Sequence, residues 1–206
     1  MLEELGASYE LRMLPFPPRA LARPFLELNP LGTVPLLVEG DTRMTESAAM
    51  CQYLAERCDP KGLAGLAVRR EEPAYGMWLN WLHHGEATLT FPQTLVLRYG
   101  RFEPVERRLP QAADDYTKWF LARLRGIDAA LAGHDWLCAD RFTAADVSVG
   151  YALMLASHLA LVDRFPVHVA AYWQRLQQRE GYGRALAAQA RAAELQGVSA
   201  KPATAG

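Results

Sequence analysis

The chain has 206 residues, half of them hydrophobic, and a formal net charge of −1 at pH 7. This size and composition suffice for one large domain or two small ones around a sizeable core. The near-neutral charge excludes binding to nucleic acid or anionic lipid through a generally basic surface. No apolar run approaches the roughly 18 residues of a membrane span, and the start has no signal-peptide pattern. We therefore expect a cytoplasmic protein with neither nucleic acid nor membrane as a partner.

The cysteines, Cys51, Cys58 and Cys138, are three in number and irregularly spaced. They form no CxxC pair and show no metal-ligand spacing. We predict reduced thiols and no bound metal.

The first 58 residues mix helical and strand-like patterns. Leu2 to Leu5, followed by Gly6, are typical of the last turn of a helix. Short apolar runs between prolines and polar turns then predict strands. The expected elements are a strand at 9–16, a short helix at 24–28, a strand at 34–38, a turn at Gly40–Asp41 into a brief strand at 42–44, and a helix at 47–57.

The remainder of the chain is helical in pattern. Residues 59–68 contain Pro60, Gly62 and Gly65 and no sustained period, which predicts a linker. Pro92 lies within a helical segment and removes one backbone donor, so we expect a bend near residues 89–92. Residues 196–206 lack a core-facing pattern and are expected to be disordered. The region 69–195 predicts helices at 70–98, 104–132, 143–161, 166–178 and 183–194.

The stretch NPLGTVP, residues 29–35, requires a special backbone. Pro35 cannot donate to a central ladder, which fits either an ordinary trans bond at the start of a strand or a cis bond in a tight turn. The cis form would expose the amide and carbonyl of Val34.

In TESAAM, residues 45–50, a strand ends and a helix begins. We expect Ser47 to be the N-cap, and the first helix amides beside it suit a carboxylate ligand. Glu46 adds a negative charge there. Together they could hold an α-amino acid end, with its carboxylate on Ser47 and its ammonium on Glu46. Plain helix capping is the alternative.

These two stretches, in this order and before a helical region, resemble the cytosolic glutathione transferase family, in particular its bacterial type. NPLGTVPLLVEGDTRMTESAAMCQYLAER, residues 29–57, resembles the thioredoxin-like half of that family nearly position by position. The resemblance implies an α/β plus all-α fold. Its parts would be an incomplete thioredoxin-like, glutathione-binding domain at 1–58, a linker at 59–68 and an all-helical domain at 69–195.

The resemblance also implies roles for single residues. Val34 would pair through its backbone with the cysteinyl part of glutathione, and Pro35 would be the cis proline that shapes this edge. Glu46 and Ser47 would hold the γ-glutamyl end. Two arginines near the second helix, Arg19 and Arg23, are looser matches for the residues that meet the glycine carboxylate.

The segment FTAADVSVGYAL, residues 142–153, resembles a later signature of the same family. In it Thr143 would cap a buried helix and Asp146 would complete a capping box, with Phe142 and Val147 as a hydrophobic staple. We assign this motif a structural role and no part in catalysis.

In this family the chain starts with a strand and a turn that bears the catalytic serine, cysteine or tyrosine. The opening MLEELGASYEL resembles only the end of the helix after that turn, so we expect the strand and the catalytic turn to be absent here. Their loss would leave backbone groups of two strands unpaired. The alternatives are a start placed inside a longer gene, a real truncation and a trimmed sequence. We assign no residue the role of stabilising the glutathione thiolate.

The segment WLHHGEAT, residues 81–88, offers further candidates. His83 and Glu86 share a helical face, which fits a metal pair or a general base, although no third ligand has suitable spacing. His84, Thr88 and Phe91 could instead border the cleft for an electrophile.

Two functions from different classes follow. In the first, a full-length form lowers the pKa of the glutathione thiol and transfers the thiolate to a small hydrophobic electrophile. In the second, the protein is a non-catalytic glutathione-binding or protein-interaction module of the same fold. The resemblance implies a homodimer with glutathione as ligand or co-substrate in either case. The sequence does not identify the electrophile.

Overall fold

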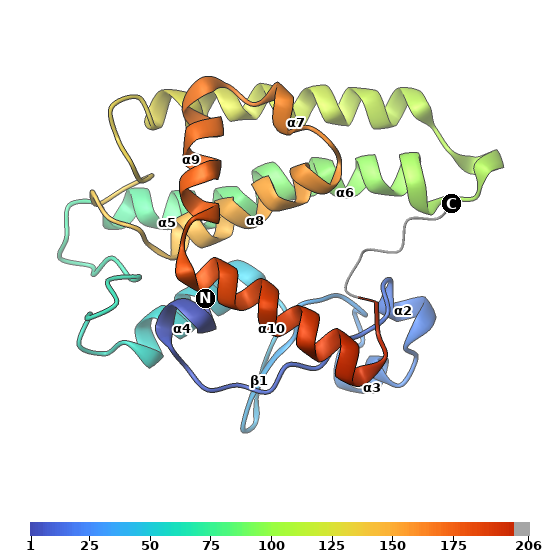
Figure 1. The fold of residues 1–206 in the computed structure, drawn as a ribbon, viewed down its shortest axis with the longest axis horizontal. Coiled ribbons are helices and arrows are strands. Elements are labelled where there is room, and N and C mark those ends of the chain that lie inside the picture. Colours follow the sequence, from blue (N-terminus) through green and yellow to red (C-terminus); the bar gives the residue numbers. More distant parts are fainter. Residues whose placement is uncertain (200–206) are drawn as a thin grey trace.

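The computed structural model describes residues 1–199, apart from the side chain of Arg19. The sequence predicts a disordered tail at 196–206. Its first residue is ordered instead, because Gln196 ends the last helix and bonds the N-terminal segment, and Gly197 caps that helix. From position 200 onward the prediction lies outside the described residues. Figure 1 shows a helical layer above a smaller layer that contains the hairpin and the short N-terminal helices.

The N-terminal layer consists of short elements and one longer helix. The chain order is α1 (Leu2–Leu5), α2 (Pro18–Leu21), α3 (Phe25–Leu28), β1 (Leu37–Glu39), β2 (Thr42–Met44) and α4 (Ser47–Cys58). Gly6 ends α1 with a left-handed φ of 60°, as the sequence predicts. The helix predicted at 47–57 is confirmed as α4.

Two strands form the antiparallel hairpin that the sequence predicts. β1 pairs with β2 in the register Leu37 with Met44 and Glu39 with Thr42, and Gly40 takes a φ of 56° in the turn. β1 begins at Leu37 rather than at the predicted Val34, because Pro35 has no N–H with which to join a ladder.

The predicted strand at 9–16 is wrong. This segment has no regular secondary structure, since no neighbouring strand of the described residues pairs with it. A side chain of the C-terminal helix bonds its backbone instead. Gln196 accepts a hydrogen bond from the Met13 amide (2.8 Å) through Oε1 and donates one to the Leu11 carbonyl (2.7 Å) through Nε2.

The helical layer begins after residues 59–68, which form no helix or strand. Its α-helices are α5 (Tyr75–His83), α6 (Phe91–Leu97), α7 (Pro110–Ala130), α8 (Ala144–His158), α9 (Val167–Gln177) and α10 (Glu180–Gln196). Between them lie the π-helical segments η1 (His84–Thr90) and η2 (Arg98–Phe102) and the 3-10 turns η3 (Val105–Arg107) and η4 (Val162–Arg164). The domain bounds themselves stay a prediction.

The long helix predicted at 70–98 is interrupted. It starts only at Tyr75, since Pro73 disfavours helical geometry in the residue before it. The hydrogen-bond pattern then switches from α to π over η1, directly before Pro92, where the sequence predicts a bend. Of the described residues, no helix combines the length and apolarity needed to cross a membrane.

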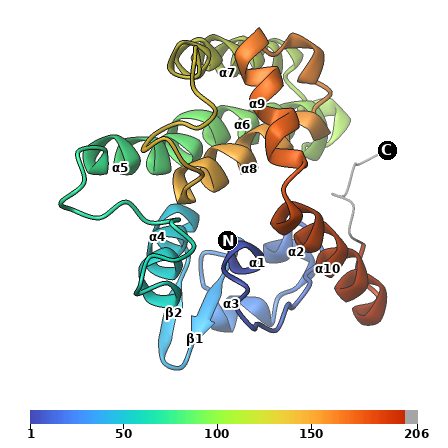
Figure 2. The same cartoon turned by 60° about the vertical axis from the view of Figure 1, so that its left-hand side comes forward.

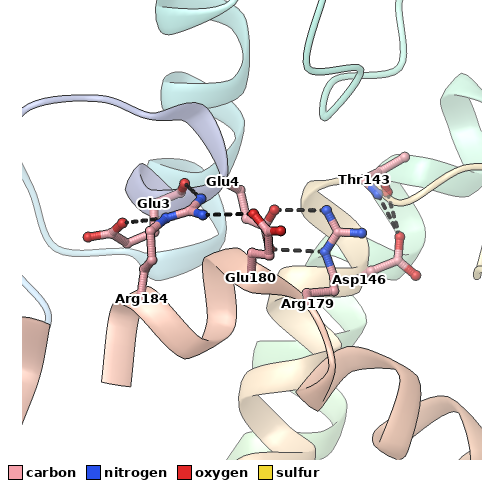
Figure 3. A network of polar contacts seen from close by, with 7 residues as sticks. All are labelled: Glu3, Glu4, Thr143, Asp146, Arg179, Glu180 and Arg184. Carbon is pink, nitrogen blue, oxygen red and sulfur yellow. Dashed lines mark hydrogen bonds and ion pairs between the residues drawn. The ribbon is translucent and has the colours of Figure 1, made fainter. Parts of the chain in front are cut away.

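α10 leaves the helical layer and lies along the N-terminal segment in both views (Figures 1 and 2). Arg179 donates to both carboxylate oxygens of Glu4, at 2.8 and 3.0 Å. Arg184 donates to the Glu3 carboxylate (3.2 Å) and to the Glu3 carbonyl (2.7 Å). Figure 3 shows these pairs side by side along α10. They fix the first helix of the chain to the last.

α8 is the central helix of the core and packs against α4, α5 and η1. Thr143 and Asp146 form the capping box that their spacing predicts: Asp146 accepts from the Thr143 amide (2.8 Å), and Thr143 Oγ1 accepts from the Ala145 amide (3.3 Å). Asp146 also accepts from the Leu137 amide (3.2 Å) and the Tyr172 hydroxyl (2.8 Å). Burial raises the pKa of Asp146, and these hydrogen bonds oppose the rise.

We expect Asp146→Ala to lower the free energy of unfolding by about 3 kcal/mol or more, because it leaves several buried donors without an acceptor. Urea denaturation followed by circular dichroism measures the change. The control is Asp114→Ala, which removes an exposed α7 carboxylate paired with Lys118 and should cost less than about 0.5 kcal/mol. Equal transition midpoints for the two variants would contradict the structural role.

Candidate functional site

A loop stabilised by one buried asparagine precedes β1. Asn29 Nδ2 donates to the Thr33 carbonyl (2.8 Å), and Asn29 Oδ1 accepts from the Leu31 amide (3.1 Å). The peptide bond between Val34 and Pro35 is cis, as the resemblance implies. Within residues 1–199 the amide and carbonyl of Val34 have no hydrogen-bond partner, and its side chain is 43% exposed. The loop therefore presents an open backbone edge.

The N-terminus of α4 differs by one residue from the prediction. Glu46 occupies the N-cap position, because its backbone is extended while its carbonyl accepts from the Met50 amide (2.9 Å). Ser47, predicted as the N-cap, is the first residue of the helix and makes no capping bond. Within residues 1–199 neither its amide nor its hydroxyl has a partner. Both groups are available to a ligand at the positive end of α4.

A second carboxylate, that of Glu86, reaches the N-terminus of α4 from the helical layer. Its Oε2 accepts from the Ala48 amide at 3.3 Å, so it satisfies the second free amide of α4. The sequence placed Glu86 beside His83 as a metal pair or a general base and gave no sign of this contact. The contact joins residues 38 positions apart in the sequence, and no local sequence pattern predicts a contact over such a separation.

Two adjoining pockets run along η1. One, of about 580 Å³, is lined by both carboxylates and by four further residues of η1 and α6: Glu46, Glu86, Ala87, Thr90, Phe91 and Thr94. The other, of about 380 Å³, is lined by Leu79, Asn80, His83, His84, Ala87 and Thr88. Ala87 borders both. The structure thus places His84 and Thr88 on one pocket of η1 and Phe91 on the other, which also includes Glu46 at the N-terminus of α4.

His84 contributes a half-buried imidazole whose pKa is lowered, which favours its uncharged form. Its burial, with a smaller contribution from the positive charge of Arg123, lowers the pKa of the imidazole. Nε2 is buried and has no hydrogen-bond partner within residues 1–199, and Trp81 packs against the ring at 5.0 Å between centroids. A neutral imidazole next to an aromatic ring suits an uncharged ligand better than an anion.

The cysteine thiols give no low-pKa nucleophile near this surface. Cys51 lies on α4, and burial raises its pKa to about 11. Cys138 is buried as well, and its pKa is likewise raised to about 11. Because the thiolate is the reactive form, both groups are poor nucleophiles at neutral pH. Within residues 1–199 no three histidine, cysteine or acidic side chains come together as a metal site, which leaves His83 and Glu86 without a third ligand.

Comparison with known sequences identifies the family. The family model for the "Glutathione S-transferase, N-terminal domain" matches residues 1–57. "Glutathione S-transferase 4" of Zea mays is 32% identical over 184 residues, which cover 86% of this chain and 80% of that protein. "Glutathione S-transferase GstA" of Escherichia coli O157:H7 is 30% identical over 170 residues, covering 80% of this chain and 78% of that protein.

A solved structure has the same fold. Ure2p5 from Phanerochaete chrysosporium, cocrystallised with 1-(S-glutathionyl)-2,4-dinitrobenzene, aligns with a TM-score of 0.78 at 24% identity, covering 94% of this chain and 88% of that one. The likeness confirms the predicted fold class, a thioredoxin-like N-terminal part followed by a helical part. Together with the sequence matches, which extend over most of each relative, it establishes that the chain belongs to the glutathione S-transferase family.

Proposed function

We propose that this protein binds glutathione between the loop at Val34 and the N-terminus of α4, and transfers its thiolate to a small hydrophobic electrophile. The observation that carries the proposal is the pair of free groups on Ser47, its amide and its hydroxyl, beside the carboxylate of Glu46. An α-amino acid end carries one anion and one cation, and this arrangement offers a partner to each.

The roles of the residues follow from their chemistry. Ser47 receives the γ-glutamyl carboxylate at the positive end of α4, and Glu46 receives the ammonium. The open amide and carbonyl of Val34 pair with the cysteinyl part, as an added strand would. Pro35 shapes this edge. For the glycine carboxylate, Arg23 is exposed and free to turn toward a ligand, whereas the side chain of Arg19 lies outside the described structure.

The electrophile occupies the surface along η1 in this proposal. Phe91, Ala87 and Leu79 give that surface an apolar part, beside the polar residues that also line it. A fungal relative of the fold was cocrystallised with a glutathione conjugate of dinitrobenzene, which supports an aromatic electrophile as the first compound to test. With 1-chloro-2,4-dinitrobenzene the thiolate sulfur forms the new C–S bond, the C–Cl bond breaks and chloride leaves.

The non-catalytic alternative is supported by one observation. Burial raises the pKa of the Cys51 and Cys138 thiols to about 11, so neither is a ready nucleophile at neutral pH. Turnover of 1-chloro-2,4-dinitrobenzene above the rate without enzyme supports the transferase. Glutathione binding without turnover supports the binding module. A cytoplasmic homodimer is part of the same proposal, and light scattering would test the dimer.

We expect Ser47→Ala and Glu46→Gln each to weaken glutathione binding by roughly 1.5 to 3 kcal/mol, the scale of one charge-assisted hydrogen bond. Calorimetric titration of each folded variant measures the loss. Ser157→Ala is the matched control, since its hydroxyl bonds only the Met154 carbonyl of its own helix (2.6 Å). Unchanged affinity in both site variants would refute the proposed site.

We expect one fast-reacting thiol per native chain at pH 8, and assign it to the exposed Cys58. At a pKa of about 11 only about one part in a thousand of Cys51 or Cys138 is thiolate at that pH. Titration with a chromogenic disulfide, before and after Cys58→Ser, counts the fast thiols. A fast thiol that persists in the Cys58→Ser variant would show that a buried cysteine is activated.

A further inference from the structure

Residues 9–13 have the pattern of a strand but no strand paired with them. The odd-numbered residues are half buried and the even-numbered ones are exposed, which is the two-residue period of a strand. In a strand the amides and carbonyls of alternate residues point to one side, so those of Tyr9, Leu11 and Met13 share one edge, the 9–13 edge. Within residues 1–199 these groups bond no other backbone group. The 9–13 edge therefore lacks a partner strand.

The side chain of Gln196 closes part of this edge. Its Oε1 accepts from the Met13 amide (2.8 Å), and its Nε2 donates to the Leu11 carbonyl (2.7 Å). One side chain thus reaches two alternate residues, which places their backbone groups on one side, as in a strand. A carboxamide offers one acceptor and one donor group, as the peptide groups of a neighbouring strand would. Gln196 therefore stands where a partner strand would pair.

The end of α10 that carries Gln196 is held by polar contacts more than by packing. Of the 17 residues of α10, Gly181 and Ala193 are the buried ones. The ion pairs with α1 come from the first turns of α10, up to Arg184. Leu195, next to Gln196, is 85% exposed. Release of this end therefore exposes little apolar surface, and the two bonds of Gln196 form a large part of the cost of uncovering the 9–13 edge.

We propose that Gln196 keeps the 9–13 edge from pairing with the same edge of a second copy of this chain. When the end of α10 is released, the edge offers unpaired amides and carbonyls, and such groups pair with another strand edge. Two identical edges form a closed antiparallel pair about a twofold axis. The inference is independent of the proposed function, because it needs no bound ligand.

The charges of the segment favour one register of this pair. With the twofold axis at Leu11, Tyr9 of each copy lies opposite Met13 of the other, so all three residues of the edge are used. Glu10 of each copy then lies opposite Arg12 of the other, which gives two cross-strand pairs of opposite charge. Both side chains are 74% exposed and form an ion pair within one chain (2.9 Å), so they can exchange partners at the surface. With the axis at Tyr9 or Met13, Glu10 does not face Arg12.

The test measures the association of the full chain by sedimentation velocity over a series of concentrations. Gln196→Ala removes both bonds to the edge and should form a species of twice the wild-type mass. We expect this species at concentrations about tenfold or more below those at which the wild type forms it, because two hydrogen bonds no longer hold the edge closed. Gln178→Ala, at the exposed C-cap of α9, is the matched control and should sediment as the wild type does.

Charge reversal tests the register of the pair. In the Gln196→Ala chain, the further change Arg12→Glu places Glu10 opposite a second acidic side chain in both cross-strand pairs. It should weaken the association about threefold or more. Adding Glu10→Arg brings back opposite charges in reversed order and should restore the association. Circular dichroism of each variant confirms that it is folded.

The outcomes decide the inference. A Gln196→Ala variant that sediments as the wild type does at every concentration would overturn it. An association that Arg12→Glu leaves unchanged, or that Glu10→Arg fails to restore, would also overturn it, because another surface would then be pairing. If Gln196→Ala does not fold, Gln196→Glu takes its place, since it loses the donor to the Leu11 carbonyl, repels that carbonyl and should open the edge as well.

Discussion

The buried carboxylate of Asp146 is the interaction on which the arrangement of this molecule depends. Asp146 accepts hydrogen bonds from Thr143, Leu137 and Tyr172. These bonds fix the start of α8 and join it to the loop that contains Leu137 and to α9, which carries Tyr172. α8 in turn packs against α4 and η1, the two elements that meet at the candidate site. One buried acidic group thus helps to fix the helix against which both elements of the candidate site pack.

Polar side chains of the C-terminal helix, α10, also hold the start of the N-terminal layer in place. A bidentate pair between Arg179 and Glu4 and the contacts of Arg184 with Glu3 hold α1 against α10. Gln196, at the other end of α10, bonds backbone groups of the extended segment that follows α1. Side chains of one helix thereby satisfy groups that a neighbouring strand would otherwise bond. The first 13 residues of the chain are therefore held in place by its last helix.

Much of this could be predicted from sequence because it depends on local chemistry. The turn at Gly40, the start of α4 to within one residue and the capping box of Thr143 follow from short motifs. The cis bond before Pro35 is implied by the family resemblance, because the motif alone fits a trans bond as well. What could not be predicted depends on tertiary contacts. A strand-like pattern at 9–16 forms no strand without a partner, and a helical pattern does not distinguish the π-helical η1 from an α-helix. Glu86 could not be placed at the site because its contact with Ala48 depends on how η1 packs on α8.

The position of opposite charges at the end of α4 explains how one small site could distinguish a zwitterion from a simple anion. Free amides and the helix dipole attract a carboxylate, yet any anion would satisfy them. Unneutralised acidic groups beside those amides repel an anion that brings no cation of its own. With Glu46 on the hairpin layer and Glu86 on the helical layer, that repulsion comes from both sides. Under the proposed function, a ligand would gain from the amides when its own positive charge offsets these carboxylates, so the relative placement of the two layers would contribute to binding.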